Sequence, residues 1–401
     1  MRLADRISRV EASKTLQVKE KALELKARGI KVVDLTAGEP DFPTPSMIGD
    51  AGIEAIRNGF TRYTANTGIP ELRKKICQKL EKDNGLKYSP EQIIVSNGAK
   101  QCILNALFAV AQEGDEVIIA APYWVSYPEQ VKLSGATPVV IDTSATNFKL
   151  QAEQLKKHLN RQTRAIIFNS PCNPTGVIYT EQELKSLAKI LIPEDIWIIT
   201  DEIYEKILFD DAQHFSIASL DNLLEKSIVI NGFSKSYSMT GWRLGYAAGP
   251  LPVIKAMSKV QSHYTSNASS ISQKAGIAAL DKASVEIQKM RKTFEERRNY
   301  IRSVLDGNEY LSYVNPQGAF YFFIDISKAF GAAVNGKQLS NSVDISTFIT
   351  ENYHLVTVPG VAFGADNYIR LSFAAAMEDL QAGMTKLTEA MKALMELKRS
   401  H

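Results

Sequence analysis

Residues 165–200 read AIIFNSPCNPTGVIYTEQELKSLAKILIPEDIWIIT, and this stretch indicates the fold class. Two short apolar runs, Ala165 to Asn169 and Ile196 to Thr200, flank a segment with helical spacing, Glu181 to Leu191. Each run has the length and the β-branched content of a buried strand. Strands that alternate with helices in this way are typical of a mostly parallel sheet covered by helices.

The same alternation continues on both sides of this stretch. Residues 101–111 also have helical spacing, and five further apolar runs have the length of buried strands. These runs are Gln92 to Ser96, Glu116 to Ala120, Thr137 to Ile141, Ser227 to Asn231 and Leu244 to Ala248. We therefore predict an α/β fold whose large domain, residues 46–295, is a three-layer α/β/α arrangement around a mostly parallel sheet.

The two ends of the chain have a different pattern. Near the C-terminus, Gly318 to Asp325, Leu355 to Pro359 and Tyr368 to Phe373 are predicted strands between long helical segments. Near the N-terminus, Leu16 to Arg28 has the spacing of an amphipathic helix and a proline-rich loop, residues 38–45, follows. Because the N-terminal helix can pack with the C-terminal unit, we predict a smaller, discontinuous α+β domain formed by residues 1–45 and 296–401.

Composition and charge exclude several classes of protein. The 401 residues are 45% hydrophobic, and the net charge is only +3 with Lys and Arg dispersed among Asp and Glu. No basic stripe with interleaved aromatic residues is present, so we expect no nucleic-acid partner. No run of about 18 apolar residues is present either, so we expect no membrane partner.

The cysteines and the first residues indicate a cellular compartment. The three cysteines, Cys77, Cys102 and Cys172, are odd in number and widely spaced, which argues against a disulfide framework and against a zinc site. Residues 1–10 are charged and lack the apolar core of a signal peptide. We expect a cytoplasmic protein with no bound metal.

Small, polar or charged residues follow four of the predicted strands. In a sheet of this type, ligands bind beyond the carboxyl ends of the strands. The segments at these ends are Asn97 to Lys100, Ser170 to Gly176, Asp201 to Tyr204 and Gly232 to Ser236. The usual sequence motifs of serine hydrolases and zinc peptidases are not found in the chain.

Two of these segments are suited to a phosphate group. Asn97 to Lys100 opens a helix with small residues, so its backbone N–H groups can face an anion. Ser234 and Ser236 flank Lys235, and Arg243 follows eight residues later. Lys235 itself stands at a strand end, where desolvation can make a lysine a nucleophile that forms a Schiff base. Considered singly, the first segment could be an ordinary turn and Lys235 a solvated loop lysine.

Asp201, Asn173 and Tyr204 extend this interpretation. A carboxylate at the end of a buried strand needs a partner, and a protonated pyridine nitrogen is one candidate. Asn173 and Tyr204 could both hydrogen-bond a phenolate oxygen on the same ring. The alternatives are a helix N-cap for Asp201 and a turn at Asn173.

With these segments in place, the chain resembles the class I, fold-type I aminotransferases that use pyridoxal 5'-phosphate. Within that class it looks most like the bacterial Iβ aspartate aminotransferase subgroup. The resemblance extends in order over nearly the whole chain. Its motifs are Leu35 to Phe42, Pro122 to Tyr127, Ser170 to Gly176, Asp201 to Tyr204, Ser234 to Gly245 and Tyr368 to Ser372.

The resemblance implies roles in cofactor binding and catalysis. Lys235 would hold the cofactor covalently and later move the substrate's α-proton, and Asp201 would keep the pyridine nitrogen protonated. Asn173 and Tyr204 would bind the ring hydroxyl oxygen, and Trp124 would stack on the ring. The residues implied at the phosphate are Gly98, Ala99, Ser234, Arg243 and, from the neighbouring subunit, Tyr63. Tyr63 in this role implies a homodimer with shared active sites.

The resemblance also implies a substrate site for small amino acids and keto acids. Arg370 would bind the α-carboxylate in a two-pronged fork, with Gly38, Trp124 and Asn173 nearby. Lys100 would bind the distal carboxylate of an acidic substrate. Thr15 together with Lys100 matches the pattern associated with prephenate as a substrate.

The expected reaction is therefore a ping-pong transfer from L-aspartate to 2-oxoglutarate, giving oxaloacetate and L-glutamate. An aminotransferase for prephenate or for aromatic substrates is the first alternative. A β-lyase with the same cofactor is a second alternative. A regulator that binds the cofactor without catalysis is a third, although such regulators carry a DNA-binding module in front of this domain.

Overall fold

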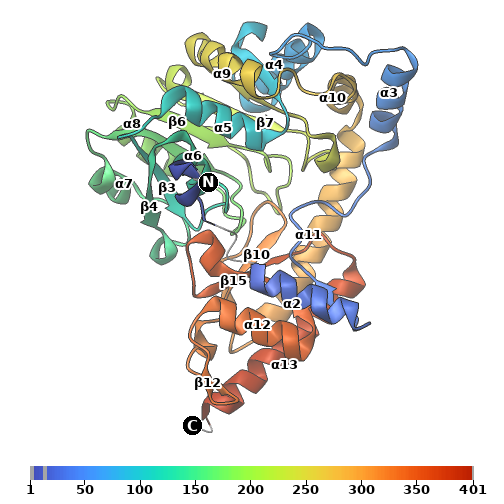
Figure 1. Ribbon diagram of the computed structural model, residues 1–401, viewed down its shortest axis with the longest axis vertical. Coiled ribbons are helices and arrows are strands. Elements are labelled where there is room, and N and C mark those ends of the chain that lie inside the picture. The colour runs from blue at the N-terminus through green and yellow to red at the C-terminus, as the bar shows by residue number, and fades with distance from the viewer. Residues whose placement is uncertain (1–3, 12–15, 400–401) are drawn as a thin grey trace.

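We describe a computed structural model of the chain for residues 4–11 and 16–399. Figure 1 shows two lobes: a large one built around a central sheet, and a smaller one that contains the C-terminus and the helix α2 (Leu16–Ala27). Among the described residues, no helix combines the length and the apolar character needed to cross a membrane.

A seven-stranded sheet forms the centre of the large lobe. Its strands lie in the order β2-β8-β7-β6-β5-β3-β4. Their bounds are β2 Ile93–Ser96, β3 Glu116–Ala121, β4 Thr137–Asp142, β5 Thr163–Asn169, β6 Trp197–Asp201, β7 Ser227–Gly232 and β8 Gly245–Ala248. Each predicted apolar run of this region corresponds to one of these strands, which confirms the predicted fold class. Only β8 runs against its neighbours, β2 and β7.

Helices cover both faces of this sheet, so its strands are apolar on both sides. Alternate residues of β3 show this: Val117 and Ile119 pack on one face, and Ile118 packs on the other. The helices on the first face are α5 Ala99–Val110, α6 Tyr127–Ser134 and α9 Leu251–Tyr264. Those on the second face are α4 Pro70–Asn84, α7 Ala152–His158, α8 Glu181–Leu191 and α10 Ser270–Lys282. The predicted three layers are thus present.

A four-stranded antiparallel sheet forms the centre of the small lobe, with strands in the order β14-β15-β10-β9. The bounds of these strands are β9 Ser312–Tyr313, β10 Tyr321–Asp325, β14 Val358–Pro359 and β15 Tyr368–Ser372. The helices of this lobe are α11 Ser284–Asp306, α12 Ser342–Tyr353 and α13 Met377–Arg399. The hairpin β11 Ala333–Val334 with β12 Lys337–Gln338 projects from it.

The N-terminal residues are divided between the two lobes. Helix α2 packs against α12, and β1 (Val33–Asp34) pairs in parallel with β13 (Leu355–Val356). The short helix α1 (Asp5–Ser8) instead lies near α6. Helix α3 (Ser46–Arg57) packs against α10 of the large lobe. Helix α11 runs across residue 295, where the predicted large domain ends. The predicted domain boundaries therefore remain a prediction.

Candidate active site

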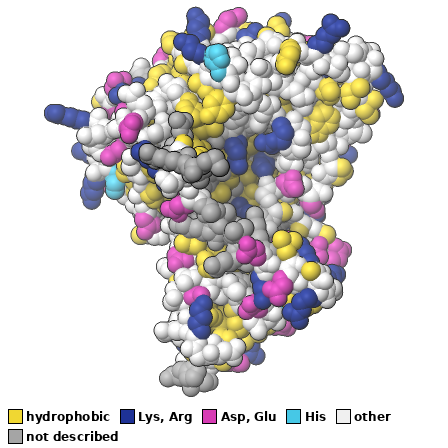
Figure 2. Space-filling view, viewed as in Figure 1, with side chains coloured by type: hydrophobic (Ala, Val, Ile, Leu, Met, Phe, Trp, Pro, Cys, Tyr) yellow, Lys and Arg dark blue, Asp and Glu magenta, His cyan; other side chains and the backbone are white. Residues whose placement is uncertain are grey.

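A cavity of about 490 Å³ lies where the carboxyl ends of the large sheet face the small lobe. In Figure 2 basic side chains gather at the recess between the two lobes. Most of the predicted site residues line this cavity. They are Gly38, Ala99, Lys100, Trp124, Asn173, Asp201, Tyr204, Ser234, Lys235, Arg243 and Arg370.

Lys235 stands just after β7, and its ammonium group points into the cavity. Its Nζ donates a hydrogen bond to the backbone carbonyl of Gly38. Burial lowers the pKa of Lys235 to about 8, with help from the positive charges of Arg370 and Arg243 and against the opposing effect of Glu39. About a tenth of this amine is therefore neutral at pH 7, far more than for an ordinary lysine, and the neutral form is the one that a nucleophile or a base requires.

Asp201 ends β6 and is 4% exposed. Its carboxylate accepts hydrogen bonds from the Tyr127 hydroxyl at 2.7 Å and from the Ile203 N–H at 3.2 Å. Burial raises the pKa of Asp201 to about 6, and these two bonds and the charge of Lys235 lower it only in part. Its hydrogen-bond donors in the described part of the chain are thus neutral groups, and a ligand cation would complete the pairing of this charge.

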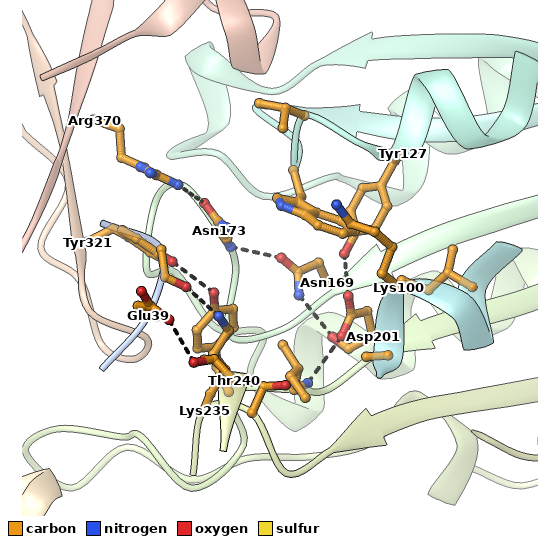
Figure 3. A pocket seen from close by; sticks show the side chains of 18 of the residues that line it. Glu39, Lys100, Tyr127, Asn169, Asn173, Asp201, Lys235, Thr240, Tyr321 and Arg370 are labelled. Atoms are coloured by element: carbon orange, nitrogen blue, oxygen red, sulfur yellow. Dashed lines mark hydrogen bonds between the residues drawn. The ribbon is translucent and has the colours of Figure 1, made fainter. Parts of the chain in front are cut away.

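Arg370, on β15, reaches the cavity from the small lobe (Figure 3). One guanidinium nitrogen donates to Asn173 Oδ1 at 3.0 Å, and another donates to the carbonyl of Thr36 at 2.8 Å. The Nε of Arg370 is buried and has no hydrogen-bond partner in the described residues. Because buried polar groups are normally satisfied, this donor suits an acidic ligand.

The start of α5 provides a corner that fits a phosphate. Gly98 has φ +85°, and a Cβ built there would lie 3.0 Å from Arg243 Nη2. A Cβ on Gly245 would lie 2.4 Å from the backbone nitrogen of Ala99. These glycines therefore leave room for the N-terminus of α5, Ser234 and Arg243 to surround one anion.

Residues 30–389 match the protein family described as "Aminotransferase class I and II". The chain belongs to this family. Aspartate aminotransferase of Geobacillus stearothermophilus is 45% identical over 395 residues, which are 98% of this chain and 100% of that relative. A "Bifunctional aspartate aminotransferase and glutamate/aspartate-prephenate aminotransferase" of Petunia hybrida is also 45% identical, over 97% of this chain and 82% of its own length.

A crystal structure of aspartate aminotransferase from Rhizobium meliloti has the same fold as this aminotransferase. The two superpose with a TM-score of 0.95 at 37% identity, over 98% of this chain and 99% of the other. The resemblance to the class I aminotransferases and to the bacterial aspartate aminotransferases is therefore confirmed.

The opposite side of the aminotransferase site carries Trp124 and Lys100. Lys100 Nζ lies 4.8 Å from the centre of the Trp124 ring. Burial and the nearby charge of Arg243 lower the pKa of Lys100. Figure 3 shows Lys100 and Arg370 on opposite sides of the cavity, with Asn173 and Asn169 between them.

Three predicted residues do not line the cavity. Gly98 adjoins it through the first turn of α5. Tyr63 is 91% exposed on the large lobe, near Thr61 and Ser269. Thr15 lies outside the described residues.

The cavity also contains residues that the sequence analysis did not assign. They include Glu39, Tyr127, Asn169, Thr240 and Tyr321. Asn169 could have been found, because it ends a predicted strand as Asp201 does, and its side chain accepts the N–H of Asn173 at 2.8 Å. Tyr321 gave no such signal, because it stands among aromatic residues that read as an apolar strand.

Proposed function

We propose that this aminotransferase binds pyridoxal 5'-phosphate through Lys235 and transfers the amino group of L-aspartate to 2-oxoglutarate, giving oxaloacetate and L-glutamate. The observation that carries the proposal is a single cavity with Lys235 and Asp201 at its base and cations on both sides, Arg370 and Lys100. The named activities of the Geobacillus and Petunia relatives support it.

The residues of the cavity match the different parts of this cofactor. When bound, pyridoxal phosphate supplies an electrophilic carbon and a ring that withdraws electrons from the substrate's α-carbon. Asp201 supplies the anionic partner for the ring nitrogen, and Tyr204 and Asn173 supply hydrogen-bonding groups for the ring oxygen. The first turn of α5, Ser234 and Arg243 would hold the phosphate, and Trp124 would cover one ring face.

Lys235 performs the proton transfer in this proposal. Its Nζ would accept the proton from the substrate's α-carbon and later release it, so that this one amine holds and moves the proton. The lowered pKa of Lys235, about 8, makes the neutral form of the amine accessible for this step.

The two cations would orient a dicarboxylic substrate. Arg370 binds the α-carboxylate, for which its unpaired Nε is available, and Lys100 binds the distal carboxylate. Prephenate is a second candidate substrate, because the Petunia relative is named for both activities and prephenate also carries two carboxylates. Thr15, the residue that matches the prephenate pattern, lies outside the described residues.

We further propose a homodimer in which Tyr63 reaches the phosphate of the neighbouring subunit. The support is its position: an aromatic hydroxyl that is 91% exposed on the surface of one subunit and outside the subunit's own cavity.

The test is a half-reaction screen with the purified protein loaded with pyridoxal phosphate. Amino donors (aspartate, glutamate, tyrosine, alanine and arogenate) are added singly, and the absorbance of the bound cofactor is followed. Aspartate and glutamate should convert the cofactor fastest, and 2-oxoglutarate should restore it. Release of ammonia without new glutamate would instead indicate the β-lyase. The variant Lys235→Ala should lose the covalently bound cofactor and turnover, and normal transamination by this variant would contradict the assignment.

A further inference from the structure

Tyr321 is the first residue of β10 and is fully buried in the wall of the cavity. Its hydroxyl lies 2.9 Å from the hydroxyl of Tyr204. The centre of its ring lies 4.4 Å from the guanidinium carbon of Arg370. Tyr321 therefore contacts two site residues of different proposed roles. Its oxygen contacts Tyr204, which is proposed to bind the cofactor, and its ring face contacts Arg370, which is proposed to bind the substrate.

The pairing of β10 with β15 fixes this arrangement. Tyr321 lies opposite Ser372, and Phe323 lies opposite Arg370. Residues two apart on a strand share a face, so Tyr321 and Arg370 are diagonal neighbours on the same face of the sheet. The guanidinium consequently lies over the Tyr321 ring, and it also lies 5.0 Å from the ring of Phe363.

The contact with Tyr204 crosses from one lobe to the other. Tyr204 follows β6 of the large lobe, and the two tyrosine rings meet edge to face at 5.9 Å. A phenol that accepts a hydrogen bond through its oxygen is free to point its own proton elsewhere. With Tyr321 as donor, the Tyr204 proton can therefore point into the cavity. Gly38 adjoins the Tyr321 hydroxyl, because a Cβ built on Gly38 would lie 3.7 Å from it, in ordinary van der Waals contact.

We propose that Tyr321 is a positioning residue that has two separate effects: its hydroxyl orients the Tyr204 hydroxyl toward the ring oxygen of the cofactor, and its ring supports the Arg370 guanidinium against the substrate carboxylate. This inference rests on the proposed function, because it assumes the cofactor and an acidic substrate in the same cavity. The two effects are separable by substitution, since one depends on the oxygen and the other on the ring.

The variant Tyr321→Phe removes the oxygen and keeps the ring. In the holoenzyme the pH midpoint of the cofactor's absorbance change should rise by about half a unit to one unit, because Tyr204 then donates less effectively to the ring oxygen. The KM for aspartate should stay within about twofold, because Arg370 keeps its support. The variant Tyr321→Leu also removes the ring, and the KM for aspartate should rise about 3- to 30-fold from the lost contact with the guanidinium.

Tyr313→Phe is the matched control. Tyr313, on the adjacent β9, donates its hydroxyl to Asp306 rather than to a residue of the cavity. This variant should leave both the midpoint and the KM unchanged, with a thermal unfolding temperature close to that of Tyr321→Phe.

Two results would overturn the inference. An unchanged absorbance midpoint in Tyr321→Phe would exclude an effect of the oxygen on the cofactor, and an unchanged KM in Tyr321→Leu would exclude support of Arg370. A parent protein that forms no such absorbance band with pyridoxal phosphate would contradict the proposed function itself, which is a different outcome.

Discussion

The burial of Asp201 is expected to destabilise the cofactor-free protein at neutral pH, because the buried carboxylate is held, among the described residues, only by neutral hydrogen-bond donors. Burial raises the pKa of this carboxyl from 3.8 to about 6. The folded state therefore binds the proton more tightly than the unfolded state, so stability falls as the pH rises from about 4 to about 6 and stays lower above. The shift corresponds to about 3 kcal/mol. Functional sites often carry such a cost, which the ligand offsets.

We therefore predict that Asp201→Asn stabilises the cofactor-free protein at pH 8 by up to about 3 kcal/mol, and changes its stability little at pH 4. Denaturant unfolding at the two pH values measures this. The same variant should bind pyridoxal phosphate more weakly, since the ring nitrogen loses its anionic partner. Asp211→Asn, at an exposed position, is the control. A loss of stability at pH 8 would mean that the bonds from Tyr127 and Ile203 outweigh the cost of burial.

Lys100 is expected to decide between dicarboxylic and neutral substrates. Lys100→Ala should lower kcat/KM for aspartate about 10- to 100-fold, because a hydrogen bond to a charged group contributes about 1.5–3 kcal/mol. For alanine and tyrosine, which lack a distal carboxylate, kcat/KM should change less than about threefold. Steady-state kinetics with the three donors tests this, with the exposed Lys82→Ala as control. Equal losses for all three donors would contradict a role specific to the distal carboxylate.

At the same scale, position in the chain together with charge or amide character indicated part of the site. Lys235 and Asn173 follow strands and Asp201 ends one, whereas Gly38, Trp124, Lys100 and Arg370 were expected only from the resemblance to the class I aminotransferases. Tyr127 and Tyr321 are recognisable only from their contacts, because an aromatic residue in an apolar segment usually packs in a core. Both have hydroxyls that bind other site residues.

Three buried carboxyl side chains, those of Asp201, Glu202 and Glu205, lie within five residues at the end of β6. Asp201 and Tyr204 face the cavity, while Glu202 and Glu205 are buried elsewhere. Glu202 Oε2 lies 3.0 Å from His214 Nε2, and Glu205 pairs with Lys79. Although Glu202, Glu205 and His214 bring potential ligand atoms within 4.8 Å of one another, the ammonium of Lys79 already balances charge there, and a metal ion is not needed.

This network predicts sensitivity to acid. The pKa of Glu205 falls to about 2, because the attraction of Lys79 and other cations outweighs the effect of burial. A lowered pKa gives stability that is present above the ordinary value of 4.5 and is lost as the pH falls toward 2. Glu205→Gln should lower the free energy of unfolding at pH 7 by about 3–5 kcal/mol, since it leaves Lys79 buried without its carboxylate.

Denaturant unfolding from pH 7 to pH 3 tests this prediction. The difference between Glu205→Gln and the parent protein should shrink toward the acid end. The control is Glu54→Gln, at an exposed position on α3. A difference that is constant over the whole pH range would mean that Glu205 acts through packing rather than through its charge.

The strands of the large sheet were largely predictable, and their pairing was not. Runs such as Ala165 to Asn169 appear in the structure within one or two residues, because strands buried on both faces are apolar throughout. The antiparallel direction of β8 cannot be recognised from its own residues. It depends on the path of residues 233–244, which return the chain from Gly232 to its sheet partner Gly245. The parallel pairing of β1 with β13 likewise joins segments that are too short to be informative alone.

For the whole molecule, exposed apolar side chains of the large lobe are compatible with a subunit contact in the proposed homodimer. Ile53 and Ile56 of α3 are 47% and 54% exposed, and Tyr63 follows them in the chain. Figure 2 shows apolar side chains gathered on the large lobe. Contiguous apolar surface is typical of protein interfaces.

Mixing inactive variants tests whether the active site is shared. Lys235→Ala should be inactive as a homodimer, and Tyr63→Ala should bind the phosphate poorly. A mixed dimer of the two regains one site that has both residues. Unfolding and refolding them together in equal amounts should therefore restore about a quarter of the parent activity. Size-exclusion chromatography confirms that dimers form, and each variant refolded alone is the control. Activity no higher than the sum of those controls would show that Tyr63 does not act across subunits.

The division of the small lobe between the two ends of the chain has a consequence for synthesis on the ribosome. The partner of β1 is β13, which emerges more than 300 residues later, and Arg370 emerges later still. The large lobe can fold while translation continues, because its seven strands end at Ala248 and the helices that cover them end at Lys282. Helix α2 and β1 must wait for the C-terminal third of the polypeptide. The nascent enzyme therefore passes through a stage in which Lys235 is in place but Arg370 has not yet been made.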